Sequence, residues 1–391
     1  MSKRVGMEAS LAISEAVKMA NVDVVSAYPI TPQTHIVESL SGIIADGELD
    51  AEFICVESEH TAMSACLGAA ACGARTFTAT AGQGLELMHE VVYAVSSMRL
   101  PVVMTVANRA LSAPLSVWGD HSDAMAVRDT GWIQVFVENA QEAYDHVLWA
   151  YRVGEDRRAL LPVMVHLDGF HVTHVVEPLE LLEQAEADRY LPINSYPHPL
   201  LPDRPVTMGA YGPPFIYTEV KKSQDVALHS VRPVIQEGWK QFAEISGRRY
   251  QPVESYQMEG ARVGILTMGS FGETASLAID QMCKRGEKVG LLKLRLWRPF
   301  PFEEVRQAVE GLEILAVVDR CISFGGPGGP VCSEIRSALY QATSRPKVVG
   351  FVAGLGGRDI SPEQFEGIAK RAEEVAEKGS PQEYEMIGVR E

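Results

Sequence analysis

The sequence predicts an α/β fold built on mostly parallel sheets that are covered by helices on both faces. Three observations support this prediction. Short apolar runs alternate with helical patterns along most of the chain, which is typical of parallel sheets. A proline-rich stretch separates a first unit of this kind from a second one that begins near residue 262. Polar side chains also follow the predicted strands, and they should meet at one edge of the first sheet: Thr31, Glu59, Gln83 and Arg109.

The composition fits a globular protein and argues against several classes. With 391 residues, 46% of them hydrophobic and 22% charged, the chain is long enough for two or three domains with a sizeable core. The net charge of −16 and the lack of a long basic run argue against nucleic-acid binding. No apolar stretch is long enough to span a bilayer, and the first residues lead straight into an amphipathic helix without a signal-peptide core. We therefore expect a cytoplasmic protein.

The six cysteines show no pair with C-x-x-C spacing. The chain is therefore not expected to carry an iron–sulfur cluster of its own. Cys66 and Cys72 lie in a helical stretch rich in alanine and glycine, and they resemble small core residues. Disulfides are not expected in the cytoplasm.

Residues 1–250 are predicted to form the first domain. Its first helix, from about residue 7 to residue 20, has one apolar face: Ala9, Ile13, Ala16, Val17 and Ala20. Further helices are expected after Thr34, over about 61–72, through Leu87, Val91 and Val95, and over about 140–153. The strands are expected over residues 22–28, 52–56, 76–80, 102–106, 133–137 and 163–167.

The stretch from 191 to 215 contains seven prolines and little periodicity. We expect residues 188–222 to cross a surface as an extended wrapping segment. A helix over about 223–246 could belong to either neighbouring unit. The second domain, residues 251–391, is predicted from strands over 263–268, 289–294, 314–318 and 348–352 and from helices that end near 284, 340 and 376.

The first predicted strand of the chain ends at a stiff turn with two prolines, Pro29 and Pro32. Each proline removes a backbone donor and favours extended geometry in the residue before it, so the strand should end at Tyr28. Thr31 then projects from the strand end, and Thr34 is expected to cap the next helix. Open α/β sheets bind ligands at such places, although an ordinary strand–helix turn gives the same pattern.

Acidic residues near predicted helix starts have both a structural and a functional interpretation. Glu59 is either a helix-start acid that interacts with the helix dipole or a buried carboxylate that binds a cofactor ring. Residues 120–123 (Asp-His-Ser-Asp) suit a metal or proton-relay cluster, or a helix N-cap in which Ser122 or Asp123 starts the turn, and no second group has metal spacing. Residues 168–171 (Asp-Gly-Phe-His) follow a strand and lack an evident partner.

Glycine-rich turns occur at Gly269, over 325–329 and over 354–357. Such turns either cradle phosphate or simply allow a positive φ angle. None of them follows G-x-G-x-x-G or the P-loop pattern, and the chain has no G-x-S-x-G stretch that would indicate a hydrolase triad.

Several short motifs occur together in one order. They are Tyr-Pro-Ile-Thr-Pro at 28–32, Glu-Ser-Glu at 57–59, Thr-Ala-Gly-Gln-Gly at 80–84, Asn-Arg-Ala-Leu at 108–111, Gly-Asp-His-Ser-Asp at 119–123, Arg-Asp-Thr-Gly-Trp at 128–132 and Phe-Val-Ala-Gly-Leu-Gly-Gly-Arg-Asp at 351–359. In combination they resemble the α subunit of the 2-oxoacid:ferredoxin oxidoreductases, with pyruvate synthase the nearest type. The resemblance covers nearly the whole chain.

This resemblance implies a fold and a set of partners. The first domain would be similar to the pyrimidine-binding domain of thiamine diphosphate enzymes, and the second to the C-terminal domain of transketolase. In this family a partner β subunit holds the diphosphate and Mg²⁺, and β- and δ-type subunits carry iron–sulfur clusters. The chain would be one component of a complex with β-, γ- and δ-type subunits, separate or fused, with coenzyme A as co-substrate and ferredoxin or NAD as electron acceptor.

The resemblance also assigns roles to single residues. Glu59 matches the acid that hydrogen-bonds the aminopyrimidine ring of thiamine diphosphate, and Thr31 and Arg109 match positions that bind the substrate carboxylate. Three more residues of the matched motifs are expected to contact the cofactor: Tyr28, Pro29 and Gln83. The implied reaction is oxidative decarboxylation of a 2-oxoacid, with pyruvate the first choice, to acyl-CoA and CO₂, while electrons pass through the clusters to ferredoxin.

The sequence leaves open the substrate, the electron acceptor, the direction in the cell, the subunit stoichiometry and the role of residues 120–123. A branched-chain or aryl 2-oxoacid such as phenylglyoxylate fits the same chemistry, and some relatives for aryl substrates pass electrons to NAD. Two other classes are a transketolase-like transferase without electron transfer and a non-catalytic scaffold subunit. Iron-dependent brown absorbance of the complex would reject the first, and cofactor bound at an interface containing Glu59 would reject the second.

Overall fold

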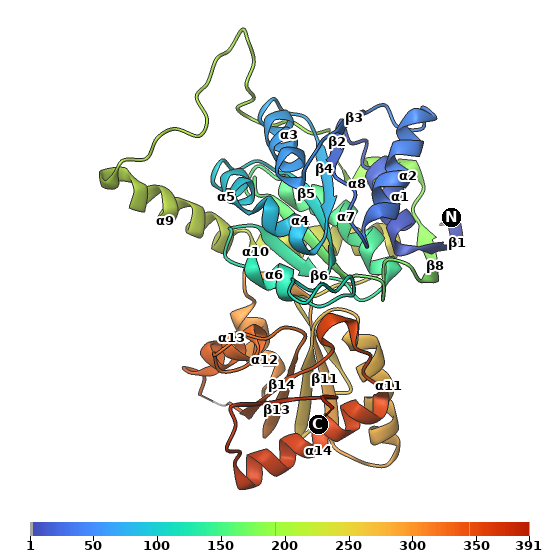
Figure 1. Cartoon of the computed structure of the whole chain (residues 1–391), viewed down its shortest axis with the longest axis vertical. Helices are drawn as coiled ribbons and strands as arrows, with labels where there is room; N and C mark the ends of the chain where they lie inside the picture. The colour runs from blue at the N-terminus through green and yellow to red at the C-terminus, as the bar shows by residue number, and fades with distance from the viewer. Residues whose placement is uncertain (1–2, 192, 344, 391) are drawn as a thin grey trace.

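The computed structural model describes residues 3–191, 193–343 and 345–390, and it places them in two α/β lobes stacked end to end (Figure 1). The upper lobe of Figure 1 is built on a seven-stranded sheet, and the lower lobe is built on a six-stranded sheet. Helices cover both faces of each sheet. The predicted α/β class with mostly parallel sheets is therefore confirmed.

The upper sheet has the strand order β12-β6-β7-β5-β4-β2-β3 and is parallel except for β12. Its central strands are buried along their whole length, which explains why they appear in the sequence as unbroken apolar runs. The strands of this sheet are β2 (Val24–Ala27), β3 (Glu52–Cys55), β4 (Thr76–Thr80), β5 (Val103–Asn108), β6 (Ile133–Phe136), β7 (Val163–Asp168) and β12 (Leu296–Arg298).

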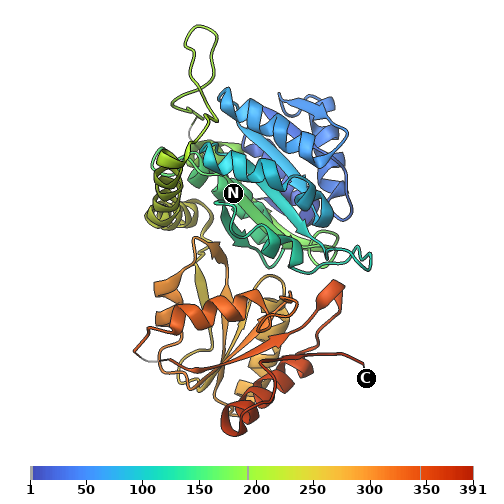
Figure 2. The ribbon, with the colours of Figure 1, turned by 60° about the vertical axis from the view of Figure 1, so that its left-hand side comes forward.

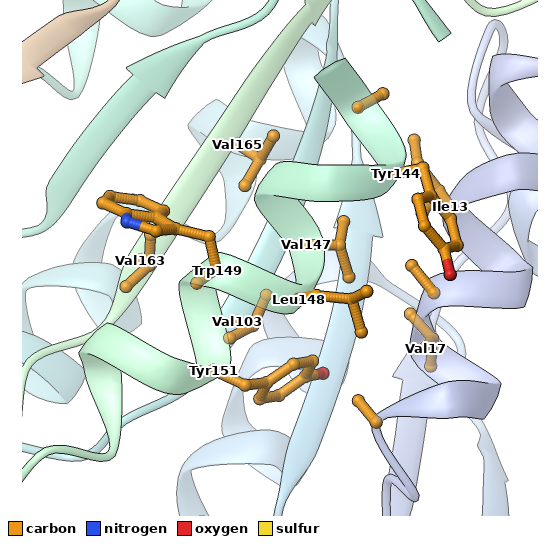
Figure 3. Packing of buried hydrophobic residues seen from close by; sticks show 14 of the residues in the cluster. Ile13, Val17, Val103, Tyr144, Val147, Leu148, Trp149, Tyr151, Val163 and Val165 are labelled. Atoms are coloured by element: carbon orange, nitrogen blue, oxygen red, sulfur yellow. The ribbon is translucent and has the colours of Figure 1, made fainter. Parts of the chain in front are cut away.

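The helices of the upper lobe lie on both sides of this sheet. On one side, Ile13 and Val17 of α1 meet Tyr144 and Leu148 of α7 over the strands (Figure 3), and the predicted apolar face of α1 is fully buried. On the other side, α3, α4 and α5 form a second cluster with β5. These helices are α1 (Ala9–Met19), α2 (Thr34–Ala45), α3 (Glu59–Ala71), α4 (Gly82–Leu87), α5 (His89–Ser97), α6 (Ser122–Ala126), α7 (Ala140–Gly154), α8 (Gln184–Tyr190), α9 (Pro214–Ser230) and α10 (Arg232–Ser246).

The chain does not lead straight into a helix at its N-terminal end. A strand, β1 (Lys3–Glu8), comes first and pairs antiparallel with β8 (Val176–Leu181) in a separate two-stranded sheet. The sequence prediction missed both strands because their residues are mostly polar or exposed and form no apolar run.

Three predicted helix boundaries in the upper lobe are wrong. Thr34 is the first helical residue of α2 and not its cap, since Gln33 holds the cap position and caps with no side-chain hydrogen bond. α3 begins at Glu59 and not near residue 61, because Ser58 caps it through the N–H of Thr61. The helix expected through residues 87–95 is two helices that meet at Met88, and Leu87 is 54% exposed.

The proline-rich region also differs from its prediction. α8 and α9 occupy both ends of the expected 188–222 segment, so only residues between them are irregular. Residues 193–213 rise from the upper lobe as a long loop, and α9 buries only Ala227 (Figures 1 and 2). The helix expected over 223–246 is interrupted at Val231 because Pro233, in the first turn of α10, has no N–H to continue the α9 pattern.

The lower sheet has the strand order β15-β14-β13-β10-β11-β9, in which only β9 is antiparallel to its neighbour. Its helices cover both faces and end near the predicted positions. The strands are β9 (Val253–Tyr256), β10 (Val263–Thr267), β11 (Val289–Leu294), β13 (Ile314–Asp319), β14 (Lys347–Val352) and β15 (Tyr384–Met386). The helices are α11 (Phe271–Lys284), α12 (Phe302–Ala308), α13 (Pro330–Leu339), the single turn η1 (Leu355–Gly357) and α14 (Pro362–Lys378).

The two lobes are joined by more than a linker. β12 follows β11 of the lower sheet in sequence but pairs with β6 of the upper sheet. Two buried ion pairs also cross the junction, Lys293 to Glu138 at 2.7 Å and Arg320 to Asp168 at 3.0 Å. These contacts place the turns of the lower lobe beside the carboxyl edge of the upper sheet.

Candidate active site at the carboxyl edge of the upper sheet

Glu59 is a buried acid at the start of a helix. It is the first residue of α3, directly after β3, and only 6% of its surface is exposed. No hydrogen bond or ion pair joins its side chain to another described residue. A buried carboxylate is costly unless it receives hydrogen bonds. Among the described residues, the acceptor capacity of the Glu59 carboxylate is therefore unused.

Gly84 lets the backbone of α4 lie close to this carboxylate. A Cβ atom at this position would lie 2.6 Å from Glu59 Oε1 and 2.6 Å from Thr80 Oγ1, closer than real side chains allow. The Thr80 hydroxyl is buried at the end of β4 and has no hydrogen-bond partner in the described part of the chain. Glu59, Thr80 and Gly84 thus converge from three elements on a small space with polar groups left to satisfy.

Arg109 lies just after β5 and is held by main-chain oxygens. Its Nη1 donates to the carbonyl oxygen of Thr31 at 3.0 Å, and its Nε donates to the carbonyl oxygen of Ser116 at 3.0 Å. Burial lowers the pKa of this guanidinium, against the opposing effect of Asp123. Among the described residues, no carboxylate lies within ion-pair distance of it. The structure brings Arg109 and Thr31 together, as the strand-edge argument predicts.

The turn that carries Tyr28, Pro29 and Thr31 is exposed on its outer side. Its inner side is fixed by Gln33, whose amide donates to the carbonyl oxygen of Tyr28 at 2.7 Å and to that of Ala79 at 3.2 Å. Gln33 was not recognised in the sequence, since a glutamine after a Pro-Thr-Pro turn has no distinctive pattern. It attaches the turn to the neighbouring strand β4.

Gln83 lies at the start of α4 and faces a different loop. Its amide nitrogen donates to the hydroxyl of Ser112 at 2.8 Å, and its Oε1 is buried without a partner among the described residues. Gln83 therefore connects α4 with the loop after β5, and it keeps one acceptor available at the site.

Residues 120–123 contain a helix start, as one of the two sequence interpretations predicts, since α6 begins at Ser122. No cluster of metal-ligating side chains occurs anywhere in the described residues. α6 begins at Ser122 without a side-chain cap, and the Asp120 carboxylate binds both the N–H and the hydroxyl of Ser122. The other oxygen of Asp120 accepts from the N–H of Gly356 in the lower lobe at 3.0 Å. Gly354, Gly356 and Gly357 adopt positive φ angles, so the 354–357 turn fits the tight-turn interpretation.

Asp168 has three partners in the structure, although the sequence suggests none. It accepts from His121 at 2.8 Å, from Ser270 and from Arg320 at 3.0 Å, and all of these except Ser270 are buried. Although burial opposes it, the charges of Arg320 and His121 hold the pKa of Asp168 well below its usual range. The sequence interpretation was wrong here because these partners lie 47 to 152 positions away.

Two cavities lie elsewhere in the described part of the molecule. One of about 690 Å³ is lined by Trp239, Tyr250 and Glu304, and one of about 510 Å³ by Arg128 and Arg298 among others. Neither is lined by the predicted site residues.

Comparison with protein families identifies the chain. Residues 15–239 match the thiamine-diphosphate-binding region of pyruvate flavodoxin/ferredoxin oxidoreductase, and residues 261–365 match core domain II of pyruvate:ferredoxin oxidoreductase. The chain belongs to the pyruvate:ferredoxin oxidoreductase family. The predicted resemblance is confirmed, and so is the predicted class of enzyme, a subunit of a 2-oxoacid:ferredoxin oxidoreductase.

Curated relatives of the family match almost the whole chain. Pyruvate synthase subunit PorA of Methanothermobacter thermautotrophicus is 48% identical over 367 residues, which are 94% of each chain. PorA of Pyrococcus abyssi is 44% identical over 392 residues, covering 100% of this chain and 99% of the relative. Ketoisovalerate oxidoreductase subunit VorA of Pyrococcus horikoshii is 42% identical over 362 residues, covering 92% and 91%.

Solved structures of the family and of a transketolase share the fold. A 2-oxoglutarate:ferredoxin oxidoreductase from Magnetococcus marinus superposes with a TM-score of 0.69 at 19% identity, covering 95% of this chain and 65% of that one. A split-gene transketolase superposes with a TM-score of 0.55 at 12% identity, covering 94% and 98%. In the described part of this family member, no helix has the length and apolar character needed to cross a membrane.

Proposed function

We propose that this chain is the α subunit of a thiamine-diphosphate-dependent enzyme that oxidatively decarboxylates pyruvate to acetyl-CoA and CO₂ and passes the electrons to ferredoxin. The observation that carries the proposal is the buried, partnerless carboxylate of Glu59 beside Gly84. It lies within the region that matches a thiamine-diphosphate-binding family model. The relatives named pyruvate synthase, at 44% to 48% identity, support pyruvate as the substrate.

The residues at this edge fit the aminopyrimidine part of the cofactor. Thiamine diphosphate, when bound, supplies the stabilised carbanion on which decarboxylation depends. Glu59 offers the negatively charged acceptor that a ring nitrogen requires, and such a charge-assisted bond is stronger than a neutral one. Gly84 keeps the adjacent space free of side-chain atoms, and the Thr80 hydroxyl is available to a second polar group. Tyr28, Pro29 and Gln83 border the same space in this proposal.

Arg109 and Thr31 would bind the substrate carboxylate. The two main-chain bonds of Arg109 use one Nη1 proton and the Nε proton, which leaves donors on the outer side of the guanidinium. A planar guanidinium holds a carboxylate through two parallel hydrogen bonds. Thr31 is exposed at the turn and can add a hydroxyl donor. Holding the 2-oxo carbon in place in this way is mainly a positioning effect.

The remaining partners belong to the complex. The relatives carry the word subunit in their names, which supports a role for this chain within a larger assembly. We propose that β-, γ- and δ-type subunits, separate or fused, supply the Mg²⁺ and diphosphate site and the iron–sulfur clusters. Coenzyme A would be the co-substrate, since the structural neighbour from Magnetococcus marinus has coenzyme A bound. Ferredoxin is the proposed acceptor, with NAD as the alternative.

A second substrate has its own support. The VorA relative, a ketoisovalerate oxidoreductase subunit, is 42% identical, only slightly less than the pyruvate synthase relatives. A branched-chain 2-oxoacid carries the same carboxylate and differs only in the size of its side chain. Arg109 and Thr31 would bind either acid, so side-chain discrimination depends on other groups at the site.

The proposal is tested by kcat/KM of the intact complex for pyruvate, 2-oxoisovalerate, phenylglyoxylate and oxalate, each with ferredoxin and with NAD. We expect pyruvate with ferredoxin to be best and oxalate to be poor, because Arg109 provides one cation for one carboxylate. Arg109→Lys should raise KM for pyruvate roughly tenfold, since a point charge cannot replace the planar fork. A preference for oxalate would refute the charge argument, and a preference for 2-oxoisovalerate would select the second substrate.

A further inference from the structure

Asp123 connects two segments of the candidate site. Its Oδ2 accepts from the N–H of Gly82 at 2.9 Å and from the N–H of Arg109 at 2.9 Å. Its Oδ1 accepts from the Asn108 side-chain amide at 2.8 Å and from the N–H of Ala124 at 2.7 Å. The residue has no exposed surface. One carboxylate thus satisfies four donors from three separate stretches of chain.

The donors belong to the two segments on which the proposed chemistry depends. Gly82 starts α4, which carries Gln83 and Gly84, and Arg109 is the proposed carboxylate-binding residue. A carboxylate suits this place because it has about four acceptor positions and no donor to conflict with the surrounding N–H groups. The asparagine amide, which has the same shape, would present a donor to at least one of them.

Arg109 is held at both ends as a result. Asp123 fixes its backbone nitrogen, while the carbonyl oxygens of Thr31 and Ser116 fix its guanidinium. Between these ends, the side chain lies against Gly82, where an added Cβ atom would come within 3.2 Å of it. A long side chain with both ends fixed loses little freedom when it binds a substrate.

We infer that Asp123 is a positioning residue for the substrate: it fixes the backbone of Arg109 and Gly82 so that the guanidinium and the start of α4 face the same 2-oxoacid. The inference deepens the proposed function and rests on it. Within residues 120–123, Asp123 then binds the backbone of the candidate site, while Asp120 accepts from the N–H of Gly356 in the lower lobe.

The charge state of Asp123 agrees with this geometry. Burial raises its pKa to about 6, against the opposing effects of the Arg109 N–H, the Asn108 amide and the Gly82 N–H, and Asp120 adds a smaller effect in the same direction as burial. At neutral pH the group is therefore mostly ionised, which is the state that accepts all four bonds.

The test compares Asp123→Asn with wild type in the intact complex. The amide keeps the shape but turns an NH₂ group toward backbone donors. We expect KM for pyruvate to rise about tenfold or more, kcat to change by less than about threefold and KM for coenzyme A to stay within about twofold, because the lost bonds act on substrate binding. An unchanged KM for pyruvate, or an equal change in both KM values, would overturn the inference.

Asp319→Asn is the matched control. Asp319 is also a buried aspartate that accepts two backbone N–H bonds, from Val331 at 2.8 Å and Cys332 at 2.9 Å, but its donors belong to α13 of the lower lobe. We expect this variant to keep both KM values within about twofold of wild type. If it raised KM for pyruvate as much as Asp123→Asn does, the effect would be general destabilisation and the inference would fail.

A double-mutant cycle with Arg109→Lys tests whether Asp123 affects pyruvate binding through Arg109. If Asp123 acts through Arg109, Asp123→Asn should raise KM for pyruvate by no more than about twofold when residue 109 is already lysine. Full additivity of the two changes would overturn the inference. If Asp123→Asn does not assemble, Asn108→Ser, which removes one donor to the same carboxylate, should raise KM for pyruvate about threefold, and no change would count against the inference.

Amide hydrogen exchange separates this inference from the proposed function. In Asp123→Asn, peptides that contain the N–H groups of Gly82 and Arg109 should exchange at least about tenfold faster, while peptides from the lower lobe should not change. If the wild-type complex oxidises no 2-oxoacid, the proposed function fails, and binding of pyruvate measured by calorimetry then replaces KM. Unchanged exchange and unchanged pyruvate binding would refute the positioning role.

Discussion

The two lobes each place a buried acid next to the start of a helix at the carboxyl edge of a parallel sheet. In the lower lobe, Asp319 ends β13 and binds two N–H groups at the start of α13, and Gly329 packs closely against its carboxylate. In the upper lobe, Glu59 starts α3 and binds nothing among the described residues. Asp319 satisfies two N–H groups at the start of α13, whereas Glu59 accepts no hydrogen bond from a described residue.

This difference teaches how to distinguish a structural acid from a functional one. Both residues are buried, and both fit the general preference for negative charge at helix N-termini. What differs is whether the surrounding chain satisfies the carboxylate: Asp319 accepts two N–H groups of α13, whereas no described residue donates to Glu59.

The largest effect is expected from Glu59→Gln, which tests whether Glu59 differs from Asp319 in function. The substitution keeps the size of the side chain but removes the charge, so kcat of the complex should fall by roughly 10²-fold or more. The complex should remain assembled, since no described residue depends on this carboxylate. Activity and thiamine diphosphate affinity of the purified complex check the result. Near-wild-type activity would place Glu59 with Asp319 as a structural helix-start acid.

Gly84→Ala tests the space beside Glu59. The added methyl group would lie 2.6 Å from Glu59 Oε1 and from Thr80 Oγ1, so one of them must move. We expect kcat/KM to fall about tenfold, because a small misplacement of a catalytic group is expensive. Gly68→Ala is the control, since nothing lies within 4 Å of the Cβ atom there. Equal losses in both variants would show that the space at Gly84 has no special role.

Asp319→Asn tests the structural role of the lower-lobe acid through the pH dependence of the free energy of unfolding. Burial raises the pKa of Asp319 to about 7, although the N–H groups of Cys332 and Val331 and the charge of Arg336 oppose it. The folded chain therefore holds this proton more tightly than the unfolded chain, whose aspartate titrates at about 4. This contribution to the free energy of unfolding is complete below about pH 4 and is lost as pH rises to about 7.

The raised pKa of Asp319 in the folded chain gives the expected result. In urea unfolding of the full-length chain, wild type should lose stability relative to Asp319→Asn as the pH rises from about 4 to 7, and the difference should then stay constant. Activity at neutral pH should change little. A stability difference that does not vary with pH would mean that Asp319 is not titrating in the folded chain over this range.

Much of the site could be predicted because parallel sheets have a simple geometry. The carboxyl ends of their strands lie at one edge, so residues after β2, β3, β4 and β5 were expected there: Arg109 contacts Thr31, and Glu59 lies beside Thr80 and Gly84. What the sequence does not show is which main-chain groups two supporting residues contact. Gln33 and Asp123 bind backbone groups of other segments, and neither residue type has a pattern that reveals such a partner in a single sequence.

The sequence by itself determined the fold class, the family and the residues that carry charge to the active edge, because apolar periodicity and strand order follow from local patterns. Only the tertiary structure decided that Glu59 is left without a partner, that Asp168 has three, and that Asp123 holds Arg109 in place. It also decided that β12 returns to the upper sheet. The physical reason is the same in each case: hydrogen bonds and ion pairs between distant segments depend on where the backbone brings them, and a lone acid in a sequence shows its charge but not its partners.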